Sequence, residues 1–379
     1  MNKKERVMAA LQHKKIDRIP WTMYASYPPW STTELIFRNE GLALIYQHFP
    51  ICRVKMDNID ITEENKFFLS SNSSGRNTIM RKFTTPVGNV RVKHEFIISS
   101  LPGPGDLIQF NGAGIDQELL SWVTEYPFRS EEDYEVLEYI YSNTSFILNN
   151  DEFLRTEKII GDEGLIFALM GKSPFQTLLY ELMGSANCYL EHYSNRRKFD
   201  RLYEILYKKI KEKYQLAAES SATIFWSPEN ITSVLTPPEF FREYYAPFYN
   251  EMADILHAKG KLFAVHMDGT LLPLMDMIRD TKIDIIEAFT PAPMGDVSVA
   301  EAMKRWNGEK IIWINFPGTL LASASFEKIE KYTMDMIASI APGDNFLIGC
   351  TESYPMDRWN ISFGAVASAL KKCGDYPVK

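Results

Sequence analysis

Ionisable side chains follow short apolar runs in the second half of the chain, and their types could support catalysis. The apolar run 262–265 stops at His266 and Asp268, and the run 283–286 stops at Glu287. Further runs end in the same way at Glu229, at Asn315, and at Cys350 with Glu352. Carboxylates and imidazoles exchange protons with substrates, and together with thiols they also bind metals. The pattern therefore predicts one site built from the ends of several strands.

Two kinds of chemistry suit this set of residues. Carboxylates that share a pocket repel one another unless a cation or a shared proton relieves the repulsion. A Zn²⁺ ion with an open coordination position accepts histidine, cysteine and carboxylate ligands and activates a substrate oxygen or sulfur as a Lewis acid. Alternatively, the carboxylates and the histidine act as acids and bases without a metal. The sequence contains no HExxH or other compact metal motif, so the residues leave both alternatives open.

The elements that must position these residues alternate along the chain. From residue 160 onward, patterns typical of buried strands and of amphipathic helices follow each other at least five times. No GxGxxG follows a strand pattern and no GxxxxGK[ST] occurs, which disfavours the open sheets that bind nucleotides. Neighbouring parallel strands lie ~4.8 Å apart, so that side chains at their carboxyl ends can converge. We therefore predict an α/β fold, a (β/α)8 TIM barrel with an N-terminal helical segment and an inserted β-hairpin.

Two features precede the barrel pattern in the first hundred residues. Residues 2–13 predict a helix that Asn2 can cap. Residues 78–99 have alternating polarity around a central turn, which is typical of a β-hairpin. The segment 24–75 between them gives no clear assignment. We expect a single domain over 1–379, with the hairpin as an insertion.

Composition narrows the function classes. The net charge is −8 and no long Lys/Arg run occurs, which argues against a nucleic-acid surface. No apolar stretch approaches the ~18 residues of a membrane helix, and the N-terminus lacks the apolar block of a signal peptide. The four cysteines are scattered without a CxxC pair, as expected of a reduced cytoplasmic protein. The 19 tyrosines and 7 tryptophans suit a large core with a homodimer face, or an aromatic pocket for an apolar or methoxylated ligand.

Five segments of the chain resemble the uroporphyrinogen decarboxylase-like superfamily. They are KKERVMAALQHKKIDRIPW, SPENITSVLTPPEFFREYYAPFY, KLFAVHMDGTLLPLMDMI, IIEAFTP and GCTESYP, and their order and spacing agree over essentially the whole chain. The superfamily contains uroporphyrinogen decarboxylases and corrinoid-dependent methyltransferases, both built on (β/α)8 barrels. This chain is more similar to the methyltransferases, and the resemblance implies the same barrel fold.

The segment around Trp21 separates the two branches of the superfamily. The decarboxylases hold the carboxylates of their substrate with arginines in a context like RPVWxMRQAG, whereas this chain reads RIPWTMYAS from Arg18, with no arginine after Met23. An octacarboxylate substrate would therefore lack its main counter-charges. The resemblance implies methyl transfer from a small methoxy, amine or thiol donor to cobalamin on a separate corrinoid protein. A metal-free decarboxylase acting on a different carboxylic acid is the alternative.

The resemblance also gives roles to the residues at the strand ends. Related methyltransferases hold Zn²⁺ with a His-x-Cys pair and a distant cysteine, and His266 and Cys350 match the first and third of these positions. Asp268 stands at the second position, so the resemblance implies a zinc site made of His266, Glu287 and Cys350, with Glu229 as the alternative carboxylate ligand. The residues expected to move protons are Glu229, His266, Asp268 and Glu287. The residues expected to contact the substrate are Trp21, Met23, Asn315 and Glu352.

Overall fold

The computed structural model describes the chain except residues 28–30, 69–74, 99–120, 352–355 and 379. Contacts between its residues divide the chain into two compact units. The barrel unit consists of Met1–Phe49, Asn150–Leu169 and Ser221–Lys379, and the accessory unit consists of Pro50–Asn149 and Met170–Ser220. The single domain expected over 1–379 is not tested by this division and stays a prediction.

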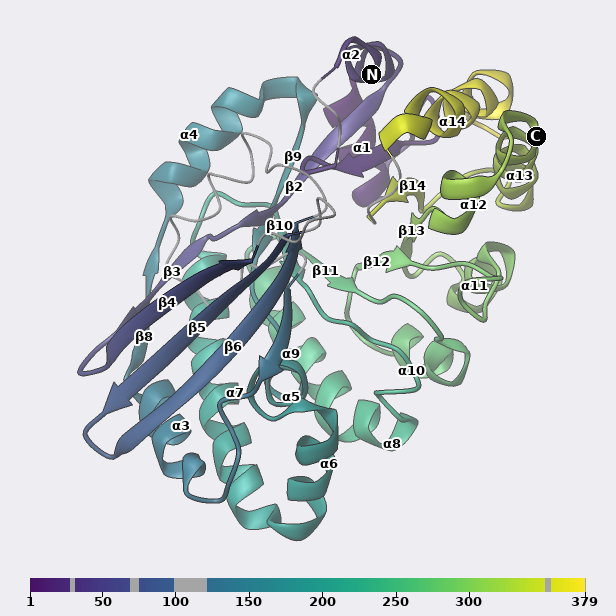
Figure 1. Cartoon of the computed structure of the whole chain (residues 1–379). Coiled ribbons are helices and arrows are strands. Elements are labelled where there is room, and N and C mark those ends of the chain that lie inside the picture. Colours follow the sequence, from purple (N-terminus) through teal and green to yellow (C-terminus); the bar gives the residue numbers. More distant parts are fainter. Residues whose placement is uncertain (28–30, 69–74, 99–120, 352–355, 379) are drawn as a thin grey trace. The chain divides into compact units, whose positions relative to one another are not determined.

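Eight parallel strands of the barrel unit close into a barrel (Figure 1). Around the barrel they follow the order β1-β14-β13-β12-β11-β10-β9-β2, and β2 pairs with β1. The closed parallel barrel with helices between its strands confirms the predicted (β/α)8 fold. The strands are β1 (Trp21–Tyr24), β2 (Leu42–Phe49), β9 (Gly164–Leu169), β10 (Ile224–Ser227), β11 (Leu262–His266), β12 (Ile285–Phe289), β13 (Ile311–Asn315) and β14 (Phe346–Cys350).

Side chains fill both faces of these strands. Every residue of β12, β13 and β14 is buried, as expected of parallel strands with a core inside and helices outside. Phe167 on β9 and Trp313 on β13 come from opposite sides of the barrel, and their ring centroids lie 5.1 Å apart in an edge-to-face contact. These two rings pack across the barrel interior, which is therefore a core and not a channel.

The helices of the barrel unit begin largely where capping residues predict. Asn2 forms a complete capping box with Glu5 at the start of α1, and the side chain of Ser298 caps α11. At α8 (Pro238–Phe240), Pro237 is the cap residue, which leaves Pro238 as the first helical residue.

The helices of the barrel unit are α1 (Lys3–Leu11), α2 (Thr32–Asn39), α4 (Asn150–Ile160), α8 (Pro238–Phe240), the π-helical segment η4 (Phe241–Tyr245), α9 (Ala246–His257), α10 (Met275–Arg279), α11 (Val299–Trp306), α12 (Gly318–Ser323), α13 (Phe326–Ser339) and α14 (Trp359–Cys373). Short 3₁₀ turns are η2 (Gly161–Glu163), η5 (Leu272–Leu274) and η6 (Met356–Arg358). No described helix of either unit is both long and apolar enough to cross a membrane.

The accessory unit contains the expected hairpin, enlarged into a sheet of four antiparallel strands. Strands β5 (Gly75–Thr85) and β6 (Gly88–Ile98) pair along their length, with β4 (Asp60–Phe68) and β7 (Ser121–Glu125) on either side. Gly88 has φ +146°, and a Cβ there would lie 2.8 Å from Val136, so the turn requires a glycine. The other elements are β3 (Cys52–Met56), β8 (Thr144–Leu148), α3 (Asp133–Ser142), α5 (Pro174–Thr177), η3 (Leu178–Leu182), α6 (Gly184–Ser194) and α7 (Arg196–Ala218).

Candidate active site

His266, the last residue of β11, and Glu287, in the middle of β12, form a hydrogen-bonded pair across two neighbouring strands. They lie opposite each other in the register of β11 and β12, and Nδ1 of His266 lies 2.7 Å from Oε2 of Glu287. Because an ionised carboxylate only accepts hydrogen bonds, we assign the proton of this bond to Nδ1. The carboxylate is fully buried, whereas 16% of the imidazole surface is exposed. The pair thus combines a partly exposed imidazole with a buried carboxylate, an arrangement suited to proton transfer.

Two further donors hold the carboxylate of Glu287. The hydroxyl of Tyr24 on β1 donates to Oε1 at 2.6 Å, and the indole Nε1 of Trp226 on β10 donates to Oε2 at 2.9 Å. Burial and the negative charge of Glu287 raise the pKa of Tyr24 well above its usual range, so its hydroxyl keeps the proton that it donates. With His266, donors from three strands compensate the desolvation of the buried carboxylate.

Two β-bulges lie at the strand ends that carry this cluster. In β12, Glu287 and Ala288 together face one residue of β13, and in β2, Gln47 and His48 together face one residue of β9. A bulge inserts one residue and changes the direction in which a side chain points, and bulges are frequent beside active sites. Ala288 has φ +58°, a left-handed conformation that costs free energy in a residue with a Cβ. Local strain therefore accompanies the orientation of Glu287.

The strain at Ala288 can be measured with a pair of glycine variants. Ala264 on β11 is also fully buried but has an ordinary strand conformation. Both Ala288→Gly and Ala264→Gly lose a buried methyl group and gain flexibility in the unfolded chain. Only Ala288→Gly also removes left-handed strain of about 1–2 kcal/mol, so its free energy of unfolding should fall by about that much less. Urea unfolding measures both values, and equal losses would show that no strain is stored at Ala288.

Aromatic rings surround the indole of Trp226. Its ring centroid lies 6.2 Å from that of Tyr24, 5.6 Å from that of His48 and 6.1 Å from that of His266. Tyr27 packs on Tyr24 at 5.9 Å and donates a hydrogen bond to the carbonyl of Thr351. Burial, and to a smaller extent the charge of His266, lower the pKa of His48 to about 4. The cluster therefore has an aromatic wall and, at neutral pH, an uncharged second imidazole.

Three of the predicted residues lie at the ends of the barrel strands with different degrees of exposure. Asp268 is 39% exposed, and its Oδ2 lies 3.9 Å from Nε2 of His266, which is beyond direct hydrogen-bond distance. Glu229 is fully buried and accepts a hydrogen bond from the hydroxyl of Ser227 at 3.0 Å. Asn315 is buried, and its side-chain oxygen accepts from the backbone N–H of Thr351 at 3.2 Å. Asn315 thus links the ends of β13 and β14.

Asp268 does not cap the helix that follows it. The backbone N–H groups of Leu271 and Leu272 donate instead to the carboxylate of Asp296, at 2.7 and 3.1 Å. The carboxylate of Asp268 lies beside His266 instead.

Trp21, Met23 and Cys350 belong to the helix-facing side of the barrel wall. The ring of Trp21 packs against Phe37 of α2 at 5.8 Å and Phe363 of α14 at 6.4 Å. Met23 points to the same side by strand alternation, and Cys350 lies in register with Met23. Tyr24, which alternates with Met23, is the residue of β1 that reaches Glu287. Glu352 lies outside the described residues.

The predicted zinc ligands are not gathered as a set. Among the residues that the structure describes, no group of three or more His, Cys, Asp or Glu side chains is arranged to hold a metal ion. Both oxygens of Glu287 accept hydrogen bonds from Tyr24, Trp226 and His266. Glu287 is therefore placed to orient His266 and not to bind a metal directly, a role that carboxylates also have behind metal-bound histidines. Zinc stays a prediction.

Tyr24, Trp226 and His48 belong to the cluster although the sequence analysis did not select them. Tyr24 and Trp226 lie at or beside the ends of predicted strands, so the same strand-end argument would have found them if aromatic donors had been considered. His48 falls in the unassigned segment 24–75. Its signal is the apolar run 42–45, which follows Gly41 and forms the first half of β2.

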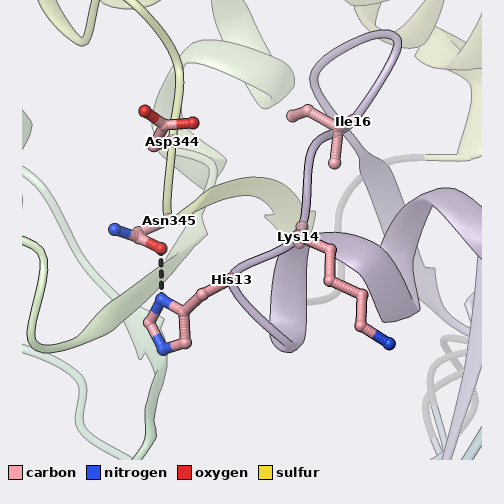
Figure 2. Close-up of a pocket in the computed structure, with 6 residues that line it drawn as sticks. His13, Lys14, Ile16, Asp344 and Asn345 are labelled. Carbon is pink, nitrogen blue, oxygen red and sulfur yellow. Dashed lines mark hydrogen bonds between the residues drawn. The ribbon is translucent and has the colours of Figure 1, made fainter.

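Two surface hollows of the molecule are lined by other residues. One, of about 280 Å³, lies where β14 begins, at the end of the barrel opposite to His266; there His13 and Asn345 face each other at 2.5 Å (Figure 2). It is lined by Ala10, His13, Lys14, Ile16, Asp344 and Asn345. The other, of about 490 Å³, lies on the four-stranded sheet of the accessory unit and is lined by charged residues, Thr78 and Met80. Neither hollow is lined by a residue of the strand-end cluster.

Comparison with known proteins identifies a family. The chain matches the sequence model of uroporphyrinogen decarboxylase (URO-D) over residues 117–356, which is more than half of its 379 residues. No curated protein matches the chain. Among similar solved structures is one of the pneumococcal virulence factor StrH, described for N-glycan recognition and hydrolysis. Its sequence is 7% identical, and the match covers 95% of this chain and 84% of that chain with a TM-score of 0.36. A similarity this low supports no conclusion about fold or function.

Proposed function

Because the chain belongs to the uroporphyrinogen decarboxylase family, we propose that it is an enzyme of this family that transfers a methyl group from a small methoxy, amine or thiol donor to a separate corrinoid protein. The observation that carries the proposal is the bond between the partly exposed His266 of β11 and the buried Glu287 of β12. A histidine oriented by a buried carboxylate is suited to protonate a leaving group.

In the proposed reaction the methyl–heteroatom bond of the donor breaks. The methyl group passes to the acceptor, and the electron pair of the bond stays on the oxygen, nitrogen or sulfur. His266 in its imidazolium form delivers a proton from Nε2 to that atom, which completes the leaving group. A reduced corrinoid, when bound, supplies the nucleophile that accepts the methyl group.

The other residues of the cluster support this proton transfer. Glu287 holds Nδ1 of His266 and stabilises the imidazolium form by its charge. Tyr24 and Trp226 fix the carboxylate in place, so the imidazole does not rotate away from the substrate. Asp268, 3.9 Å from Nε2, is placed to return a proton to His266 from solvent, since 39% of its side chain is exposed.

The sequence around the first strand favours an uncharged methyl donor as the substrate over a polycarboxylate. Residues 19–26 read IPWTMYAS, which contains no arginine or lysine. The residue of this segment that lies in the cluster is Tyr24, whose hydroxyl already donates a hydrogen bond to Glu287. A carboxylate substrate beside Glu287 and Asp268 would meet like charge, which raises the free energy of binding. Uncharged methyl ethers, thioethers or amines in their neutral form avoid this repulsion.

The experiment that tests the proposal uses purified protein with reduced cobalamin in place of the corrinoid protein. We expect methylcobalamin, followed by its visible absorbance, with at least one member of a panel of methoxyaromatics, methylamines and methylthiols. A reaction without protein is the control for spontaneous methylation. If no member of the panel methylates cobalamin above this control, the proposed function is wrong.

A metal-free decarboxylase of a different carboxylic acid is the second candidate. The complete His266–Glu287 pair favours it, because protonation of a carbanion after loss of CO₂ needs the same acid. Release of CO₂ from a carboxylic acid in the presence of a chelator, without methylation of cobalamin, would select this candidate. Elemental analysis of the wild type beside His266→Ala tests the separate zinc prediction, which neither route of proton transfer requires.

A further inference from the structure

His48 is a second imidazole in the cluster whose outer nitrogen is not used by the protein. Its ring stands edge-on to Trp226, at 5.6 Å and an interplanar angle of 83°. Nε2 of His48 is buried, and within the part of the chain that the structure describes it has no hydrogen-bond partner. Burying a polar nitrogen without a partner costs free energy comparable to a lost hydrogen bond. Such a group calls for an explanation other than packing.

Packing alone would be served better by an apolar ring. The strand that carries His48 begins with the apolar run 42–45, and phenylalanine would fill a place beside Trp226 without an unpaired nitrogen. The β-bulge at Gln47 and His48 inserts an extra residue just before the end of β2. This irregularity brings the ring to the indole that His266 also contacts, at 6.1 Å. The backbone is therefore shaped so that the two imidazoles lie on one tryptophan.

We propose that Nε2 of His48 forms a hydrogen bond with the uncharged heteroatom of the substrate, and so determines which ligands bind beside His266. The choice of ligand class rests on the proposed function, since the heteroatom is the ether, thioether or amine group that carries the methyl. Burial keeps the pKa of His48 at about 4, so the ring is neutral at pH 7 and offers a hydrogen bond without a charge. His266 then provides the proton, and His48 positions the atom that receives it.

The test compares two substitutions at one position and two ligands of one shape. His48→Phe keeps a ring and removes the nitrogens, whereas His48→Gln keeps an amide that can replace the hydrogen bond. Methoxybenzene and ethylbenzene differ only in an oxygen against a methylene group. Calorimetric titration gives the Kd of each ligand for the three proteins. We expect His48→Phe to raise the Kd for methoxybenzene about tenfold, which is the effect of losing one hydrogen bond. The Kd for ethylbenzene should change less than about twofold.

The expected result for His48→Gln is a Kd for methoxybenzene within about threefold of the wild type, because its amide restores the contact. Thermal unfolding of both variants checks that each is folded; His48→Phe should be at least as stable as the wild type, since it buries no unpaired nitrogen. An equal rise in the Kd of both ligands in His48→Phe would indicate a packing role and overturn the proposal. Equal Kd values of wild type and His48→Phe for methoxybenzene, or no binding by the wild type, would overturn it as well.

The outcomes also separate this inference from the proposed function. Binding of methoxybenzene that depends on His48, without any methylation of cobalamin by the panel, supports the contact and contradicts methyl transfer. Methylation with the same KM in the wild type and His48→Phe supports methyl transfer and contradicts the contact. A rise in KM with little change in kcat for His48→Phe supports both.

Discussion

Replacing Glu287 by glutamine is expected to lower turnover by about 10²–10⁴-fold, because the imidazole of His266 loses the anion that orients it and stabilises its charged form. The structure also predicts a large loss of stability. The hydroxyl of Tyr24, the indole N–H of Trp226 and Nδ1–H of His266 all donate to the two oxygens of Glu287. A glutamine has one oxygen and one NH₂ group, so at least one of these donors would face another donor.

The stability change should be about 2–4 kcal/mol, the range for a buried hydrogen-bonded group that leaves its partners unsatisfied. Glu301→Gln is the matched control. Glu301 pairs with Arg305 one turn along α11 at 2.8 Å, and 44% of its side chain is exposed. Such a surface pair contributes less than about 1 kcal/mol, so the control should keep its stability and turnover. Urea unfolding and turnover of both variants give the comparison, and a Glu287→Gln protein with turnover within threefold of the wild type would refute the role of Glu287.

The removal of the imidazole in His266→Ala is also expected to have a large effect on catalysis. The variant loses the proton donor itself, and turnover should fall by about 10³-fold. Its stability should change by only about 1 kcal/mol, because Tyr24 and Trp226 still hold Glu287 and the lost side chain is partly exposed. A fall in turnover with nearly unchanged unfolding distinguishes a catalytic residue from a structural one.

A second histidine–carboxylate pair provides the control for this variant. Nε2 of His257, at the end of α9, lies 2.8 Å from Oδ2 of Asp284, and this hydrogen bond raises the pKa of His257 above its usual range. His257 lies on the surface. Its partner Asp284 directly precedes β12 and so lies at the amino end of that strand, away from Glu287. His257→Ala should keep turnover within about twofold, because a contact this far from the reacting atoms does not enter the transition state.

The barrel could be predicted because its strands are short apolar runs with clear ends. The runs before His266 and Glu287 became β11 and β12, and the two residues are paired in register, as expected for neighbouring parallel strands. The capping residue Asn2 marked the start of α1. These are local signals, since a strand end or a helix start depends on residues close in sequence.

The side of the wall to which each residue points could not be predicted. Strands of a parallel barrel are buried on both faces, so the sequence pattern does not distinguish the interior from the helix layer. Cys350 was selected for its position at a strand end and Trp21 from the family resemblance, but Trp21 packs against α2 and α14. Tyr24, three residues after Trp21, was passed over and reaches Glu287. One step along a strand reverses the facing of a side chain.

The β-bulges were also beyond sequence reasoning. An extra residue at Glu287 and Ala288, or at Gln47 and His48, has no sequence signal, because neither site contains the glycine that often marks a bulge. The bonds from Tyr24 and Trp226 to Glu287 join residues more than 60 positions apart. They depend on closure of the whole barrel and so become visible only in the structure.

The most direct test of His266 as the proton donor is the rate of cobalamin methylation by His266→Ala, measured with and without added imidazole. The donor is the best substrate from the panel, and His257→Ala is assayed alongside. The account predicts a rate about 10³-fold below that of the wild type, and an increase when imidazole is added, because the free base can occupy the space beside Glu287 and supply the proton. A His266→Ala protein that methylates cobalamin as fast as the wild type without imidazole would contradict it.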